Sequence, residues 1–465
     1  MMSNSQKVYA TKFSSPAVVW LDKPVSAFWT SLCFSLLFCG YPLVSFVPDF
    51  LPVKDRQAAV AFRAVCFLLS FVIAIKEFRN SVRKGHQPLS VWFVIGAAFW
   101  VAYLGRILSD DSMVAGIGPL PIFDFLAYSF GISAMTLLSM TMVRDPMQLR
   151  HAPVMCVTIS SVVCALASYF GLENYTAEMA GRLFANDRLN PILLGHSAVV
   201  MFVGAAWMLL RKMDDRNVAA KQDAQLVSRR LRSVGLLVVN ICLMAMGLYT
   251  LVLSSSRSPV IALLICLVLL MVWMRRHAVL LMLLIFVAAL VFMQSNMLSS
   301  LTGAGLDTER MTRSVVLTDD YMQGGRIDLY AEAFAKFLQS PIWGKSLFND
   351  SMTYPHNLII ETLMALGLLG GALLIAMLLV GFRCLVIASK HSSIGQWLLL
   401  VFIHSFVATM TSGAIFYDPM MWTTLGVSLG LSSRIHHRPF ENRPHRRESA
   451  PSRVPGNVGK LPRAV

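Results

Sequence analysis

Charged side chains are scarce in this chain, and long polar stretches are scarcer still. Asp, Glu, Lys and Arg make up 14% of its 465 residues, whereas a soluble domain carries about 25%. The hydrophobic share is 56%, and the mean hydropathy is +0.62. This composition excludes a soluble globular protein and indicates an integral membrane protein.

Cysteine is missing from the long polar segments. All eight cysteines lie within or at the ends of hydrophobic runs, so we expect neither a disulfide framework nor a metal cluster. The sequence also lacks paired carboxylates at glycosidase spacing, a glycine-rich phosphate loop and a G-x-S-x-G nucleophile motif. It predicts no bound metal and no cofactor.

Hydrophobic runs near the length of a membrane span recur along the whole chain. About twelve runs approach the roughly 20 residues that cross a bilayer as an α-helix. We expect an all-α polytopic membrane protein, because backbone amides in lipid need hydrogen bonds within each helix. The expected spans are 25–47, 57–75, 89–108, 121–143, 152–172, 190–210, 233–254, 258–274, 277–293, 357–381, 394–412 and 417–433.

The net charge of +15 is concentrated in alternate loops. Lys and Arg gather, for example, between residues 76 and 84 and between residues 211 and 232. The positive-inside rule makes these loops cytoplasmic, which places both termini inside and residues 295–356 outside. The charge therefore indicates topology and not a nucleic-acid partner. We expect one transmembrane domain, 1–434, followed by a disordered basic cytoplasmic tail, 435–465.

Residues 295–356 form the one long polar stretch that falls between two expected spans. Apolar residues recur there at helical spacing and predict an amphipathic helix over about 326–339, on the membrane surface or against the bundle. Pro341 ends this pattern. Asn357 or His356 is expected to cap the following transmembrane helix. The apolar face of the amphipathic helix comprises Ile327, Tyr330, Ala331, Phe334, Phe337 and Leu338.

His356 is the first candidate for chemistry in this stretch. We expect it in the first turn of the following helix, where the positive end of the helix dipole disfavours an imidazolium. A neutral histidine there can accept a proton as a general base. The alternative is a histidine that only caps the helix or lies at the membrane interface.

Three arginines from separate loops are expected on the same outer face. Arg257 follows Ser256 in a short turn between two spans, and Arg326 follows Gly325 in the long stretch. Arg188 comes from another outer loop. A guanidinium can hold a phosphate with two hydrogen bonds, and glycine permits close approach to a ligand. Each arginine alone is explained by contact with the interface, but together they indicate an anionic ligand.

Ionisable residues also occur inside the expected spans. Such groups are costly in lipid and usually face protein or water, so they are candidates to line a cavity. We expect a supporting role for the glutamate among them, because it lies on another helix face than His356. These residues are Arg63, Asp124, His196, Glu361 and His404.

The motifs around the long stretch resemble one known family. They are Arg326 with the amphipathic helix, Pro341-x-x-Gly344, Pro355-His356-Asn357-x-x-Ile360, Gly367-x-x-Gly370, the Ser256-Arg257 turn and Arg188-Leu189. Over about residues 180–375 this pattern resembles the bacterial O-antigen ligase and polymerase superfamily, and the expected topology resembles it over the remainder. One departure is Ser346, which stands where the family often has a second glycine.

The resemblance implies a metal-independent, inverting glycosyltransferase of the bacterial inner membrane with its site facing the periplasm. The donor would be a glycan linked to undecaprenyl diphosphate. His356 would be the base, and Arg257, Arg326 and Arg188 would bind the diphosphate. Asn357, Gly325 and Ser256 would support them.

Two acceptors fit this family. A ligase transfers to the lipid A core oligosaccharide, and an O-antigen or exopolysaccharide polymerase transfers to another carrier-linked unit. We favour the ligase, because one dominant outer loop carries both Arg326 and His356. A protein O-glycosyl transferase is a further member of this class. A twelve-span transporter is less favoured, since the two halves of the chain show no repeat.

Overall fold

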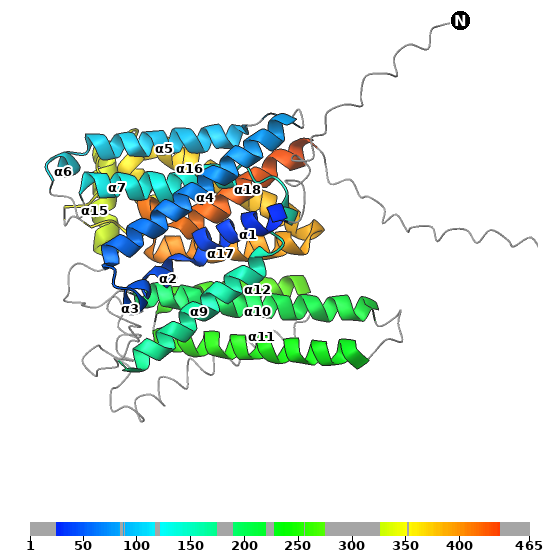
Figure 1. Cartoon of the computed structure of the whole chain (residues 1–465). Helices are drawn as coiled ribbons and strands as arrows, with labels where there is room; N and C mark the ends of the chain where they lie inside the picture. The colour runs from blue at the N-terminus through cyan, green and yellow to red at the C-terminus, as the bar shows by residue number, and fades with distance from the viewer. Residues whose placement is uncertain are drawn as a thin grey trace, which may run out of the picture.

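The chain folds into a bundle of helices that run side by side (Figure 1). Every regular element within the described residues is a helix, which confirms the predicted all-α fold class. The predicted span 277–293 and most of the predicted tail lie outside the described residues. The computed structural model describes residues 25–83, 87, 89–116, 121–173, 189–219, 227–254, 256–274, 326–350 and 353–437.

The first half of the bundle contains two interrupted spans. The predicted span 25–47 bends by 71° after Cys39, because Pro42 cannot donate the next helical hydrogen bond. A π-helical segment interrupts the span that starts at Ile122. The elements are α1 (Val25–Cys39), α2 (Tyr41–Val44), α3 (Val47–Phe50), α4 (Asp55–Arg83), α5 (Val91–Ser109), α6 (Asp111–Val114), α7 (Ile122–Tyr128), the π-helix η2 (Ser129–Ala134), α8 (Met135–Met140), the 3-10 helix η3 (Pro146–Leu149) and α9 (Ala152–Glu173).

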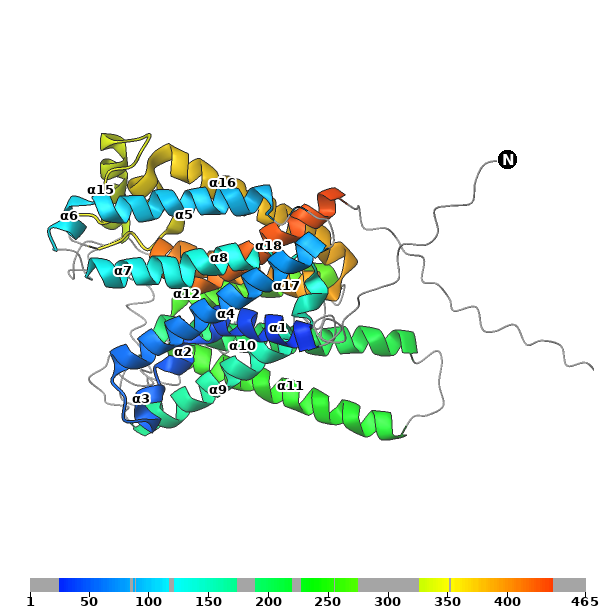
Figure 2. The same ribbon diagram turned by 45° about the horizontal axis from the view of Figure 1, so that its top comes forward.

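The second half of the bundle contains the amphipathic helix predicted over 326–339, which the structure confirms as α15. Helices α9 to α12 lie together on one side, and the later helices return to the first half (Figure 2). The elements are α10 (Pro191–Ala219), α11 (Val227–Ser254), α12 (Arg257–Met274), α15 (Arg326–Gln339), α16 (Leu358–His391), α17 (Ser393–Ser412), the 3-10 helix η5 (Ile415–Tyr417) and α18 (Pro419–His437).

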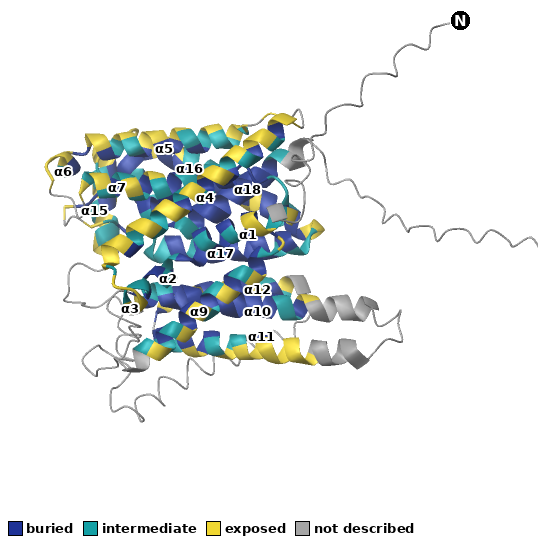
Figure 3. Cartoon of the chain, in the orientation of Figure 1, coloured by how far each residue is buried: buried dark blue, intermediate teal, exposed yellow. Residues whose placement is uncertain are grey.

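The chain is a polytopic membrane protein. Among the described residues, eight helices are long and apolar enough to cross a membrane, and the bent pair after Cys39 makes up to nine. Helices also occupy the predicted spans at 258–274 and 417–433. Large apolar side chains on the outward faces of α4 and α11 remain exposed (Figure 3), as expected for surfaces in contact with lipid. A total of twelve spans stays a prediction.

Helix α18 is the most enclosed helix, although its composition is comparatively polar. Its residues 421–432 are buried without interruption (Figure 3). Its hydroxyl groups bond within the helix, as Thr424 does to the Met420 carbonyl at 3.0 Å. A β-carbon on Gly430 would lie 2.4 Å from the Val143 oxygen. Small and hydroxyl-bearing residues therefore let α18 pack closely against its neighbours within the membrane.

Candidate functional site

His356 has the most unusual backbone conformation among the described residues. Its φ is +53°, and it is the one non-glycine residue there with a positive φ. This left-handed region costs an ordinary residue roughly 1–2 kcal/mol. Surrounding contacts must therefore hold His356 in place, and outliers of this kind gather at functional sites.

Asn357, and not His356, caps α16. Its Oδ1 accepts hydrogen bonds from the amides of Ile359 (3.2 Å) and Ile360 (3.1 Å). Its Nδ2 donates to the carbonyl of Met410 in α17 at 3.2 Å. The expectation that His356 occupies the first helical turn is wrong, because the amide side chain of Asn357 satisfies the free N–H groups and starts the helix. His356 instead lies just outside the helix, directly before the residue that contacts α17.

Residues 340–350, called the strap here, pack into a kink of α16. Gly367 has a φ of +64° inside α16 and interrupts the helical hydrogen bonds there. The carbonyl of Met364 accepts instead from the strap, through the amide of Lys345 at 2.8 Å. In the other direction, the amide of Leu368 in α16 donates to the carbonyl of Pro341 in the strap at 2.8 Å. The strap thus replaces hydrogen bonds that the kink removes.

Two glycines allow this close contact of strap and helix. A β-carbon on Gly344 would lie 2.3 Å from the carbonyl carbon of Ala365, and one on Gly367 would lie 2.4 Å from that of Ile342. Both glycines have a positive φ, which glycine adopts at little cost. The Pro341-x-x-Gly344 and Gly367-x-x-Gly370 motifs are therefore the two halves of one joint.

Arg106 of α5 closes the joint from the other side. Its Nε donates to the carbonyl of Ala365 at 2.9 Å, and its Nη2 donates to those of Trp343 (2.8 Å) and Gly344 (3.0 Å). Irregular backbone at membrane depth needs such donors. The sequence analysis missed Arg106, because an arginine near the end of a span looks like one that reaches to the interface.

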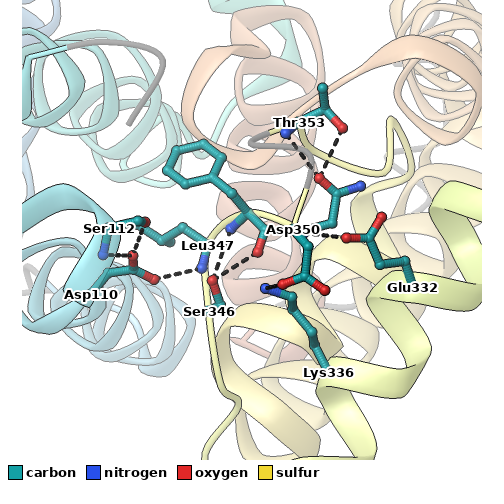
Figure 4. A network of polar contacts seen from close by, with 10 residues as sticks. Asp110, Ser112, Glu332, Lys336, Ser346, Leu347, Asp350 and Thr353 are labelled. Carbon is teal, nitrogen blue, oxygen red and sulfur yellow. Dashed lines mark hydrogen bonds and ion pairs between the residues drawn. The ribbon is translucent and has the colours of Figure 1, made fainter. Parts of the chain in front are cut away.

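Polar contacts fix the remainder of the strap between α5 and α15 (Figure 4). Asp110, at the end of α5, accepts a hydrogen bond from the amide of Leu347 at 2.8 Å. On the α15 side, Lys336 pairs with Asp350 at 2.7 Å, and this contact lowers the pKa of the Asp350 carboxyl. Glu332 accepts from the Asp350 amide. The segment leading to His356 is thus anchored at both sides.

Helix α15 uses only part of its predicted apolar face for packing. Of that predicted face Phe337 is buried where α15 contacts α16, together with Ala333, which was not part of the predicted face. Ile327, Phe334 and Leu338 remain exposed, at 59%, 52% and 60%. One stripe of the helix therefore packs on the bundle, and a second apolar stripe is free to lie on a membrane surface.

Aromatic rings continue from His356 toward α4 and α7. The Tyr354 ring lies 4.4 Å from the His356 ring and 5.7 Å from that of Phe416. The centroid of the Tyr128 ring lies 6.4 Å from that of Phe416 and 6.1 Å from that of Tyr417. Burial raises the pKa of Tyr354, so its hydroxyl stays protonated. With Tyr41, which contacts Tyr417 at 5.7 Å, these residues form what we call the aromatic wall: Tyr41, Tyr128, Tyr354, Phe416 and Tyr417.

Two buried carboxyl groups hold the turn that carries Phe416 and Tyr417. Both oxygens of Glu361 lie 3.1 Å from the amide of Ile415. The carboxylate of Asp418 accepts a hydrogen bond from the amide of Met421 at 3.1 Å. It also accepts one from the hydroxyl of Thr409 in α17. Glu361 therefore points into the bundle, where it supports the aromatic wall.

Arg257 is brought to the same end of the bundle as His356. It is the first residue of α12, so the expectation that it lies in the preceding turn is wrong: the helix already begins there. The next residue, Ser258, hydrogen-bonds Thr411 of α17. Thr411 directly follows the residue that accepts from Asn357. One turn of α17 therefore holds both the start of α12 and the start of α16.

The remaining predicted residues differ in what the structure describes. Ser256 is buried immediately before Arg257. Arg326 begins α15, and its side chain lies outside the described part. Gly325 and Arg188 fall outside the described residues altogether. Of the predicted diphosphate-binding set, the structure thus brings Arg257 to the His356 end of the bundle.

Two buried histidines extend the hydrogen bonds of Ser258 into the bundle, from Ser258 to His196 and from His196 to His404. The Nε2 atom of His196 lies 3.2 Å from the Ser258 hydroxyl, and its Nδ1 lies 3.1 Å from Nε2 of His404. Their exposed fractions are 3% and 2%. These two residues, expected as candidates to line a cavity, form a packed pair that joins α10, α12 and α17.

The fold and site define a polytopic membrane protein that gathers its strained, aromatic and cationic residues at one end of the bundle. Residues 242–375 match the family model described as O-antigen ligase. This stretch of the chain is therefore similar to the O-antigen ligase and polymerase superfamily, a family of membrane enzymes that act on lipid-linked glycans. The match includes Arg257, the strap and His356, whereas Arg188 precedes it. No curated protein matches the chain.

Proposed function

We propose that this protein transfers O-antigen polysaccharide from undecaprenyl diphosphate to the lipid A core oligosaccharide. One observation carries the proposal. His356 lies inside the O-antigen ligase match, in a strained conformation, at the same turn of α17 that holds the helix led by Arg257. A base and a cation at one end of a membrane bundle suit a reaction between two lipid-anchored substrates.

The proposed reaction follows from the chemistry of these side chains. His356 takes the proton of the acceptor hydroxyl while the hydroxyl oxygen attacks the anomeric carbon of the donor. The bond from that carbon to the diphosphate breaks on the opposite face, so the configuration inverts. Arg257, Arg326 and Arg188 bind the diphosphate and offset its charge as it leaves. These arginines supply the positive charge at the leaving group, so the proposed reaction is metal-independent.

A polymerase of the same superfamily is the second candidate. It would use the same base and arginines, with a carrier-linked glycan as the acceptor. The ligase is favoured because Arg326 and His356 come from one large loop, whose strap and α15 form a single anchored wall. The other outer loops expected from the sequence are shorter.

The proposed setting is the bacterial inner membrane, with the strap in the periplasm and both termini in the cytoplasm. Basic residues at the opposite end of the bundle, such as Arg83 and Lys390, support this orientation. Cysteines introduced singly at Ser340 and Ser392, in a Cys242→Ala background, test it. A membrane-impermeant thiol reagent applied to spheroplasts should label position 340 and spare position 392. The reverse pattern contradicts the orientation.

Deletion of the gene tests the proposed function directly. Two pools are compared, the surface polysaccharide and the carrier-linked glycan. Long carrier-linked chains together with bare lipid A core indicate a ligase. Single repeats on the core indicate a polymerase, and unchanged glycans contradict both.

A further inference from the structure

Arg63 of α4 is a charged residue inside a membrane-spanning helix. It lies eight positions after Asp55, where α4 begins, which is roughly 12 Å along the helix axis. Charge in hydrocarbon is costly, so such residues face protein or water and commonly mark a functional path. Arg63 is half-buried and points to the aromatic wall.

The guanidinium of Arg63 is held by an aromatic ring rather than by a carboxylate. Its Cζ lies 3.4 Å from the centroid of the Tyr128 ring, and its Nη2 donates to the Tyr128 hydroxyl. Its buried Nε has no hydrogen-bond partner in the part of the chain that the structure describes. Asp124, whose charge acts on it, is already paired with Arg56 at 2.7 Å. Among the described residues Arg63 forms no ion pair, so donor groups remain for an anion.

The same wall of rings leads from Arg63 to His356. Tyr128 contacts Phe416, Phe416 contacts Tyr354, and Tyr354 contacts the ring of His356 at 4.4 Å. The four tyrosines of the wall are half-buried, so each keeps part of its surface open. Partly open rings with polar tips suit a surface that carries sugars.

Arg63 and Arg257 approach this region from different sides of the bundle. Helix α4 packs against α1 and α8, whereas α12 packs against α10 and α17 (Figures 1 and 2). His356 is tied to the α12 side through the end of α17 and to the α4 side through the aromatic wall. Arg63 and Arg257 therefore belong to two different groups of helices that both connect to the segment carrying His356.

We propose that Arg63 binds an anionic group of the acceptor, either a phosphate or a carboxylate. This inference rests on the proposed function, in which Arg257 takes the diphosphate of the donor. Two anionic substrates need separate cationic sites, so that the hydroxyl of one meets the anomeric carbon of the other at His356. Tyr128 orients the Arg63 guanidinium, and the wall carries the acceptor sugars toward the base.

Binding to the full-length protein in nanodiscs tests this assignment. The background is His356→Ala, which stops turnover, and the probes are purified lipid A core and undecaprenyl diphosphate-linked glycan. Arg63→Met should raise the Kd for the core about 10- to 100-fold, the range for losing hydrogen bonds to a charged group. The Kd for the donor should change less than about twofold. Arg79→Met, at the opposite end of α4, is the matched control and should change neither.

Chemical treatment of the acceptor identifies the anion. Phosphatase treatment removes the Arg63 effect if the group is a phosphate, and carboxyl reduction removes it if the group is a carboxylate. An effect that survives both treatments, a loss of donor binding instead, or an unchanged Kd for the core overturns the assignment. Transfer that persists in the His356→Ala protein contradicts the proposed base and leaves the binding result intact, so the two failures are distinguishable.

Discussion

The two ends of the bundle differ in the way their backbone is built. At one end, helices start after single side-chain caps. Ser90 accepts from the Phe93 amide at 3.1 Å at the start of α5, and Ser392 accepts from the Gly395 amide at 2.9 Å at the start of α17. These are the simplest ways to satisfy the free N–H groups of a helix.

The other end contains most of the irregular backbone. The break after Cys39, the kink at Gly367 and the positive φ of His356 lie toward that end, and the π-helix η2, in the middle of its span, contacts η5. Irregular backbone is tolerated in a membrane protein only where other groups satisfy it, and at the Gly367 kink Arg106 does so. The strain at this end therefore indicates where the function lies.

The largest expected effect comes from replacing the histidine at the irregular end. His356→Ala should lower kcat about 100- to 10 000-fold, the usual contribution of a general base. His391→Ala, at the other end of α16, should leave kcat unchanged. Transfer of carrier-linked glycan to lipid A core by purified protein is the measurement. Equal activity of the two variants would end the assignment of a base.

The next effect concerns the cation on the α12 side. Arg257→Ala should lower kcat/KM for the donor about 100- to 1000-fold, because the leaving diphosphate loses a charged donor. Arg257→Lys should recover only part of this, since an ammonium cannot bind with two parallel hydrogen bonds. Arg211→Ala, which removes a cation near Trp207 in α10, is the control at the other end and should match wild type. A wild-type kcat/KM for the donor in Arg257→Ala contradicts the diphosphate role.

A smaller effect tests the joint between the strap and α16. Gly367→Ala should destabilise the protein by about 2 kcal/mol or more, because a β-carbon meets the strap and the positive φ disfavours alanine. Gly235→Ala, in α11, is the control, since its β-carbon meets nothing within 4 Å. Thermal unfolding in detergent measures both. Similar unfolding temperatures for the two variants show that the joint is looser than the structure indicates.

The sequence was sufficient where a strong local pattern exists. The apolar period and Pro341 predicted α15 with its observed bounds, because both signals act within a few residues. Hydrophobic runs likewise predicted the spans that the described helices occupy, since span length is set by the bilayer. The roles of His356 and Arg257 stay predictions that the geometry supports.

The sequence was insufficient where distant residues meet. The three carbonyl groups that accept from Arg106 lie more than 230 positions after it in the chain. No local sequence pattern predicts these contacts. The positive φ of His356 was also missed, because a histidine before an asparagine is equally compatible with the first turn of a helix. Both features depend on long-range contacts that fix a backbone its own sequence does not favour.

The smallest expected effect separates a cap that only stabilises from one that also positions. Asn357→Ala and Ser90→Ala each remove one cap, and each should cost about 1 kcal/mol of stability. Only Asn357→Ala should also lower kcat, by roughly tenfold, because His356 loses its anchor on α17 and proton transfer is sensitive to small displacements. Unfolding temperature and kcat are measured on the same samples. Equal kcat in the two variants would show that Asn357 only caps α16 and does not position His356.

Asn357→Asp separates the hydrogen bond that Asn357 donates to α17 from the hydrogen bonds with which it caps α16. The aspartate can still accept from the amides of Ile359 and Ile360, so α16 keeps its N-terminal cap. It cannot donate to the carbonyl of Met410, which the asparagine reaches at 3.2 Å. A stable protein with reduced kcat therefore assigns the loss to the position of His356. Full kcat in this variant would show that the strap and the aromatic wall hold His356 without help from α17.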